Sequence, residues 1–67
     1  MLVVFTKKGS YYRLKYGDLK PELDSEPTTI QVDGIEIERL ISLELVKNNI
    51  AKKTWTGEEA ERLWKML

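Results

Sequence analysis

Apolar and polar residues alternate along the first part of the chain with the period of two that is typical of β-strands. The segment Leu2–Thr6 is rich in branched apolar residues, Lys7–Ser10 contains turn-forming residues, and Tyr11–Tyr16 alternates again. This pattern predicts a β-hairpin. The following segment, Gly17–Pro27, contains prolines and scattered acids without periodicity, so we expect a loop there,.

The last segment of the chain has the apolar spacing of an amphipathic helix. Its apolar residues follow the i, i+3, i+4, i+7 rule and form a single stripe. These residues are Ala60, Leu63, Trp64 and Leu67. Thr56 and Glu59 have the spacing of a capping box, in which both side chains satisfy free amides of the first turn. We therefore predict a helix from Gly57 to the C-terminus.

A second hairpin is predicted in the middle of the chain. Asp33-Gly34 lies between the alternating segments Thr28–Val32 and Ile35–Arg39. Asp-Gly favours the positive φ angles of a type I′ turn, which joins two antiparallel strands.

The segment 40–55 is ambiguous. Its periodicity favours a strand through Leu45, whereas its content of leucine, glutamate and lysine favours a helix. We follow the periodicity, which makes Asn48-Asn49 a turn into a further strand at Ile50–Trp55. The whole chain, residues 1–67, then forms a single α+β domain. It has about five short antiparallel strands, arranged as hairpins in a small barrel or curved sheet, and one C-terminal helix.

The composition limits how so small a core can be stabilised. The chain has 67 residues and neither cysteine nor histidine. Disulfides are therefore excluded, and a zinc or other transition-metal site is not expected. Domains of this size usually need a further support, so we expect very good packing or self-association as a homodimer. Without histidine the commonest general base is missing, and we expect a protein that is not an enzyme and needs no cofactor.

The small size of the chain and its lack of cysteine also indicate the cellular compartment of the protein. A domain this small without disulfides is expected in the cytoplasm. The apolar run Met1–Phe5 follows no basic residue and is too short for a signal peptide or a membrane span. No other segment is apolar enough to cross a bilayer, so we expect no membrane partner.

The 11 basic and 11 acidic side chains cancel, but they are unevenly distributed. Met1–Gly17 carries cations and no acid, whereas Asp18–Glu44 is strongly acidic. Such segregation produces either separate basic and acidic faces or strands that neutralise each other across a ladder. We favour neutralisation as the simpler interpretation.

The N-terminal hairpin is the first candidate binding surface. It interleaves aromatic and basic side chains, a combination that binds single-stranded nucleic acid through base stacking and phosphate contacts. The residues concerned are Phe5, Lys7, Lys8, Tyr11, Arg13 and Lys15. The same residues also suit an ordinary hairpin, because tyrosine favours strands and lysine protects exposed strand edges.

Trp55 is the second candidate. Directly before the predicted cap Thr56, it is placed to pack on Ala60 as a hydrophobic staple. It could instead anchor a protein partner, because tryptophan is frequent in interface hot spots. We favour the staple.

The acidic residues give weaker signals. Glu36 and Glu38 would share one face of a strand, where they could form a paired-carboxylate site, but the solvent face of a hairpin is the simpler interpretation,. The acids of the Gly17–Pro27 loop match no calcium-binding spacing, and the isolated glycines form no phosphate-binding loop. We predict no catalytic, cofactor or metal site and no small-molecule ligand.

Two functions are compatible with these observations. The leading expectation is a self-associating protein-interaction or accessory module, of the small kind encoded by phages or mobile elements. The alternative is a nucleic-acid-binding module that uses the N-terminal hairpin. The alternative is favoured if the basic side chains gather on one face of the folded protein. Those side chains are Lys7, Lys8, Arg13, Lys15, Lys52 and Lys53.

Overall fold

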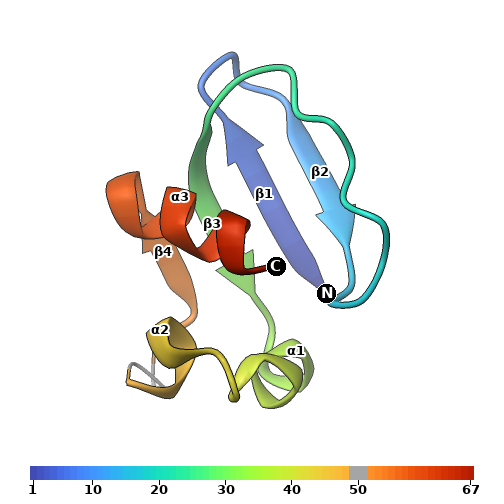
Figure 1. Cartoon of the computed structure of the whole chain (residues 1–67). Helices are drawn as coiled ribbons and strands as arrows, with labels where there is room; N and C mark the ends of the chain where they lie inside the picture. Colours follow the sequence, from blue (N-terminus) through green and yellow to red (C-terminus); the bar gives the residue numbers. More distant parts are fainter. Residues whose placement is uncertain (49–51) are drawn as a thin grey trace.

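A four-stranded antiparallel sheet organises the protein, as the computed structural model shows (Figure 1). The structure describes residues 1–48 and 52–67. The strands are β1 (Leu2–Thr6), β2 (Tyr11–Leu14), β3 (Pro27–Val32) and β4 (Thr54–Thr56), in the order β2-β1-β3-β4. The helices are α1 (Gly34–Leu40), α2 (Glu44–Lys47) and α3 (Gly57–Met66). The predicted α+β class is confirmed, but the sheet stays open and forms no closed barrel.

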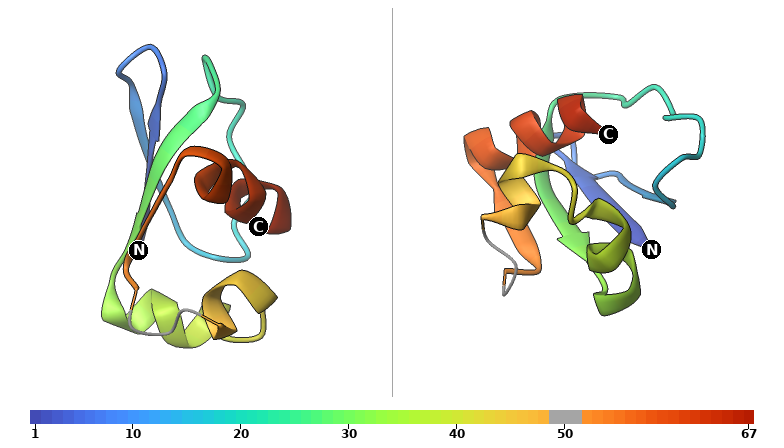
Figure 2. Two further views of the ribbon diagram at one scale, coloured as in Figure 1. Left: turned by 90° about the vertical axis from the view of Figure 1, so that its left-hand side faces the viewer. Right: turned by 60° about the horizontal axis from the view of Figure 1, so that its bottom comes forward.

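The core lies between one face of the sheet and the helices. Alternate strand residues such as Leu2, Val4 and Ile30 are fully buried, and α3 covers them with Ala60 and Leu63. Helices α1 and α2 complete the core. The left view of Figure 2 shows the sheet edge-on, with every helix and the long loop after β2 on the same side. Within residues 1–48 and 52–67, no helix or loop covers the other face of the sheet.

The N-terminal hairpin is confirmed, although β2 ends at Leu14 and not at Tyr16. The chain leaves the sheet there because the amide of Tyr16 binds the carboxylate of Glu36, at 2.9 Å, and not a neighbouring strand. Gly17 then adopts a φ of 99°, which L side chains rarely adopt,. The segment that follows is a loop, as predicted.

The predicted hairpin at Asp33-Gly34 is wrong. Thr28–Val32 does belong to β3, but Ile35–Arg39 is helical. Asp33 has extended backbone angles, and its side chain accepts a hydrogen bond from the amide of Glu36 at 2.8 Å. The aspartate therefore caps the N-terminus of α1, which is the other common role of this residue type before a helix.

The segment 40–55 is only partly a strand. Glu44–Lys47 forms α2, so the residue composition was the better guide there and the periodicity was misleading. The predicted final strand is reduced to Thr54–Thr56, and Asn48 closes α2 as its C-cap. The predicted turn residue Asn49 and the first residues of the predicted strand, 50 and 51, lie outside the described residues. The sheet accordingly has four strands and not five.

The C-terminal helix is confirmed as α3. Thr56 is its N-cap residue, but the threonine side chain makes no capping hydrogen bond. Glu59 turns instead to Lys52, whose Nζ donates to its carboxylate at 2.7 Å. The predicted capping box is therefore wrong, because the Glu59 carboxylate forms an ion pair with Lys52 and not a hydrogen bond to the start of the helix.

Candidate functional site

The uncovered face of the sheet carries two rows of outward side chains that cross all four strands. The register aligns one row through Phe5 and Thr29 and the other through Val3 and Gln31. The aromatic row consists of Tyr11, Phe5, Thr29 and Thr56. The polar row consists of Arg13, Val3, Gln31 and Thr54. These positions alternate with the buried ones, so they point away from the helices. We call this surface the open face.

The aromatic row begins with two rings on neighbouring strands. The ring centroids of Phe5 and Tyr11 are 6.2 Å apart, with an interplanar angle of 41°. Tyr11 is 58% exposed. The guanidinium carbon of Arg13 lies 5.7 Å from the centre of the Tyr11 ring, within the range of a cation–π interaction,. The two rows thus meet in an exposed aromatic surface with a cation held beside it.

The polar row borders a shallow hollow at the end of the sheet where β1 begins. Its volume is about 320 Å³, and Val3, Gln31 and Thr54 line it together with Lys53 and Met1. Amide, hydroxyl, ammonium and carboxylate groups, from Gln31, Thr54, Lys53 and Asp33, therefore share the lining with apolar side chains. This combination is typical of a small binding site.

All acidic side chains lie outside the strands. None of the 11 acids of the chain falls within β1, β2, β3 or β4. They lie on the helices, on their caps and in the loop after β2. Figure 2 shows the helices and this loop on the other side of the sheet from the open face, whereas Asp33, the cap of α1, lines the hollow of the open face. The strands cannot neutralise each other across a ladder, so that prediction is wrong. Charges of both signs lie mostly outside the strands, and Arg13 is the one charged side chain within the four described strands.

The predicted basic residues are only partly brought together. Arg13 belongs to the open face and Lys53 lines its hollow. Lys7 and Lys8 lie in the turn between β1 and β2, at the end of the sheet next to the aromatic row, and both are exposed.

The other two cations lie elsewhere. Lys15 follows the end of β2 and lines a cavity with the core-facing Leu2 and Leu14. Lys52 is paired with Glu59 of α3. The six cations therefore do not converge on one face.

Trp55 is part of the core and does not serve as an exposed anchor. Its exposed fraction is 0%, and it pairs with Ile30 across β3 and β4. The indole nitrogen is buried and has no hydrogen-bond partner among the described residues. Trp55 is thus enclosed in the core of this fold, and Ala60 of α3 belongs to the same core and is equally buried.

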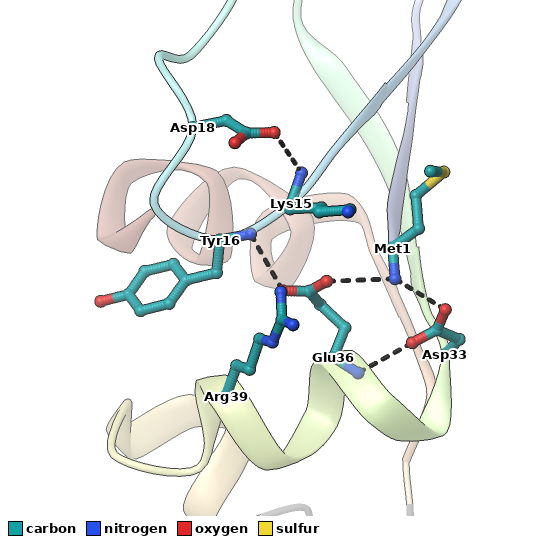
Figure 3. Close-up of polar contacts among 7 residues, drawn as sticks. All are labelled: Met1, Lys15, Tyr16, Asp18, Asp33, Glu36 and Arg39. Carbon is teal, nitrogen blue, oxygen red and sulfur yellow. Dashed lines mark hydrogen bonds and ion pairs between the residues drawn. The ribbon is translucent and has the colours of Figure 1, made fainter.

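Glu36 is a buried charged residue that ties three segments together (Figure 3). Its exposed fraction is 1%. One carboxylate oxygen accepts from the amide of Tyr16, and the other lies 3.1 Å from the amino group of Met1. Arg39 adds a longer contact of 4.0 Å. The carboxylate connects α1 to the start of β1 and to the end of the β2 segment.

Asp33 completes this cluster. It lies 2.6 Å from the amino group of Met1. The hydrogen bond from that amino group and the bond from the Glu36 amide lower the pKa of Asp33 below its usual value of 3.8. Desolvation acts to lower the pKa of the Met1 amino group, but the hydrogen bonds and charges of Asp33 and Glu36 outweigh it and raise this pKa above 8.0. The cluster is a structural clamp at one end of the open face.

The remaining acids form no candidate site. Glu36 and Glu38 lie on a helix, one buried and one exposed, so the paired-carboxylate arrangement on a strand is wrong. In the loop, Asp24 accepts hydrogen bonds from Ser10 and Ser25, and Ser10 chiefly holds the pKa of this carboxyl below its usual value. Within residues 1–48 and 52–67, no three carboxylates gather in a way that could hold a metal ion.

Residues of β3 and β4 on the open face were not identified from the sequence. Gln31, Thr29 and Thr54 become part of a surface only once the strand order is known. The available signal was the alternation of threonine and glutamine with apolar residues in the segment 28–32, which indicated an exposed side but not its neighbours.

Neither a family model nor a curated protein nor a solved structure matches this chain. The candidate site must therefore be interpreted from its own geometry. In the described part of the chain, every helix is too short or too polar to cross a bilayer.

Proposed function

We propose that this protein is a non-enzymatic binding module that holds single-stranded nucleic acid on the open face. The observation that carries the proposal is the pairing of the exposed Tyr11 with the half-buried Phe5, with Arg13 beside them, on a sheet whose strands contain no acid. The six predicted cations do not gather on one face, so the proposal does not rest on a basic patch; it is supported by aromatic rings and one arginine on an uncovered sheet face. For this reason we rank nucleic acid above a protein partner.

The aromatic row supplies the stacking. Every base has a flat π-face, so exposed rings on a sheet bind bases of single strands with little dependence on sequence. The 6.2 Å between the two ring centres spans neighbouring strands, which suits two successive bases spread over the sheet. Arg13 can hold a phosphate or stack on a base from its position beside Tyr11.

Electrostatics make a smaller contribution than stacking. Arg13 and Lys53 lie on the open face, and Lys7 and Lys8 lie at its end. With so few cations we expect about two or three phosphate contacts, so the logarithm of affinity falls with that of salt concentration with a slope of about −2. The neutral net charge of the chain is consistent with this modest dependence.

Fluorescence anisotropy with labelled oligonucleotides tests the proposal. At low salt we expect binding of single-stranded DNA or RNA, weakened about tenfold by Tyr11→Ala, since stacking on one ring is worth about 1–3 kcal/mol per base. Tyr16→Ala is the matched control, because Tyr16 is also exposed but lies beyond the sheet beside α1. Arg13→Ala should reduce affinity and the salt slope, whereas Arg62→Ala on α3 should change neither.

Self-association is the competing outcome of the same experiment. Val3, Phe5 and Thr29 are half-buried on an uncovered face, and two such faces could pack against each other as a dimer,. Sedimentation at several concentrations measures this directly. A stable dimer that leaves Tyr11 inaccessible and binds no oligonucleotide at low salt would overturn the nucleic-acid proposal and restore the protein-interaction function.

A further inference from the structure

The hollow at the end of the polar row lies on the same surface as the stacking residues. Val3 links the two, because it lines the hollow and is aligned with Arg13, whose guanidinium lies beside Tyr11. A strand that stacks on the aromatic row and continues along β1 and β3 would bring its next nucleotide over the hollow. The position of the hollow is therefore that of one further base.

The groups around the hollow are suited to a nucleobase. Met1 and Val3 provide apolar contact for a ring, and the hydroxyl of Thr54 both donates and accepts,. Lys53 supplies a cation for the adjoining phosphate. The only carboxylate in the lining is that of Asp33, which is already engaged by the Met1 amino group and the Glu36 amide.

Gln31 is the group that can distinguish between bases. Its side chain projects from the centre of the polar row, and within the described residues nothing hydrogen-bonds its amide. A glutamine amide presents one acceptor and one donor side by side. Adenine presents the complementary pair, an amino group next to a ring nitrogen, on both its Watson–Crick and its Hoogsteen edge, and glutamine pairs with either edge through two hydrogen bonds. Thymine presents a donor beside an acceptor on its Watson–Crick edge alone, so Gln31 can hold adenine in more orientations.

We infer that the hollow receives one base of the bound strand and that Gln31 selects adenine there. This inference rests on the proposed function and adds a preference at one position to a surface that otherwise binds without regard to sequence. The geometry also admits free adenine nucleotide, which carries the same base and phosphate, and the test separates the two sources.

Titration of oligothymidylate carrying a single adenine, against oligothymidylate alone, measures the preference. We expect the adenine to strengthen binding about tenfold, in the lower range of a bidentate base contact. Replacing that adenine by purine, which lacks the amino group, should abolish the gain. Gln31→Ala should also abolish the gain, so that the two oligonucleotides bind this variant with equal affinity, whereas the control variant Tyr16→Ala should keep the roughly tenfold ratio.

The outcomes separate this inference from the proposed function. Binding of all oligonucleotides without preference for adenine would overturn the role of Gln31 and leave the stacking surface intact. An adenine preference that survives in Gln31→Ala would also overturn it. Failure of every oligonucleotide to bind would remove the proposed function itself. If adenosine monophosphate alone binds as tightly as the adenine-containing strand, the hollow is a site for the free nucleotide and the assignment to a strand is wrong.

Discussion

The amide of Tyr16 donates to the buried carboxylate of Glu36, 20 residues further along the chain, at 2.9 Å. This bond joins the end of the hairpin to α1, and the same carboxylate reaches the amino group of Met1. Burying a carboxylate destabilises the folded protein unless its oxygens accept hydrogen bonds or form ion pairs. The contacts of Glu36 with Tyr16 and Met1 should therefore stabilise the fold cooperatively.

Removing the Glu36 carboxylate should destabilise the fold. Glu36→Ala leaves the Tyr16 amide without its partner, and we expect a loss of about 1–3 kcal/mol in the free energy of unfolding. Glu36→Gln should lose less, because the amide oxygen can still accept from Tyr16. Urea denaturation measures both. Glu38→Ala on the exposed side of α1 is the control and should stay within about 0.5 kcal/mol; equal losses at both positions would contradict the role of the clamp.

Stability should have a plateau between the two titrations of the clamp. The pKa of Asp33 is lowered from 3.8, so its contribution is present above that value and is lost as the pH falls through the lowered pKa,. The pKa of the Met1 amino group is raised from 8.0, so its contribution is present below 8.0 and is lost as the pH rises through the raised pKa,.

Denaturation midpoints across the pH range test this assignment. Asp33→Asn should reduce the loss of stability at acidic pH. Acetylation of the Met1 amino group should reduce the loss of stability at alkaline pH. An Asp33→Asn protein with an unchanged loss of stability at acidic pH would show that other carboxyls, such as Asp24, determine it.

The two helix caps should differ in importance. Asp33 makes a capping hydrogen bond to Glu36, whereas the side chain of Thr56 makes none. We therefore expect Asp33→Ala to lower the melting temperature clearly more than Thr56→Ala does, although both residues occupy N-cap positions. Thermal unfolding followed by circular dichroism is sufficient. A larger effect at Thr56 would mean that the predicted capping box forms in solution.

Trp55 should tolerate replacement by phenylalanine far better than by alanine. Trp55→Ala opens a cavity in the centre of the core and should cost about 3–5 kcal/mol. Trp55→Phe loses less volume and also removes a buried donor without a partner, so we expect about 1–2 kcal/mol,. Denaturation monitored by far-ultraviolet circular dichroism avoids reliance on tryptophan fluorescence. Similar losses for both variants would indicate that the indole nitrogen has a partner.

The ends of the chain were predictable because each follows one strong local signal. Alternation identified β1 and β2, and an apolar stripe identified α3. The middle of the chain was not predictable, because aspartate is common both in hairpin turns and at helix N-caps, so Asp33 fits either structure. The deciding contact, between Asp33 and the Met1 amino group, joins residues far apart in sequence.

The candidate site was predictable only in part for a similar reason. Tyr11 and Arg13 stand out in the sequence as an aromatic and a basic residue on one face of a strand. Their neighbours across the sheet depend on β1 lying between β2 and β3, which no local pattern reveals. Burial of Trp55 likewise depends on Ile30 of a distant strand.

The absence of acids from the strands gives the neutral chain an electric dipole. The acids outnumber the basic residues on the helices, their caps and the loop after β2, whereas Arg13 is the one charged side chain within the four described strands. Under the proposed function, a polyanion meets an excess of acids on the helical side and none within the strands of the open face, so the open face is the favoured side of approach,. Zero net charge thus leaves the protein with a preferred orientation of encounter, which a uniformly basic domain would not have.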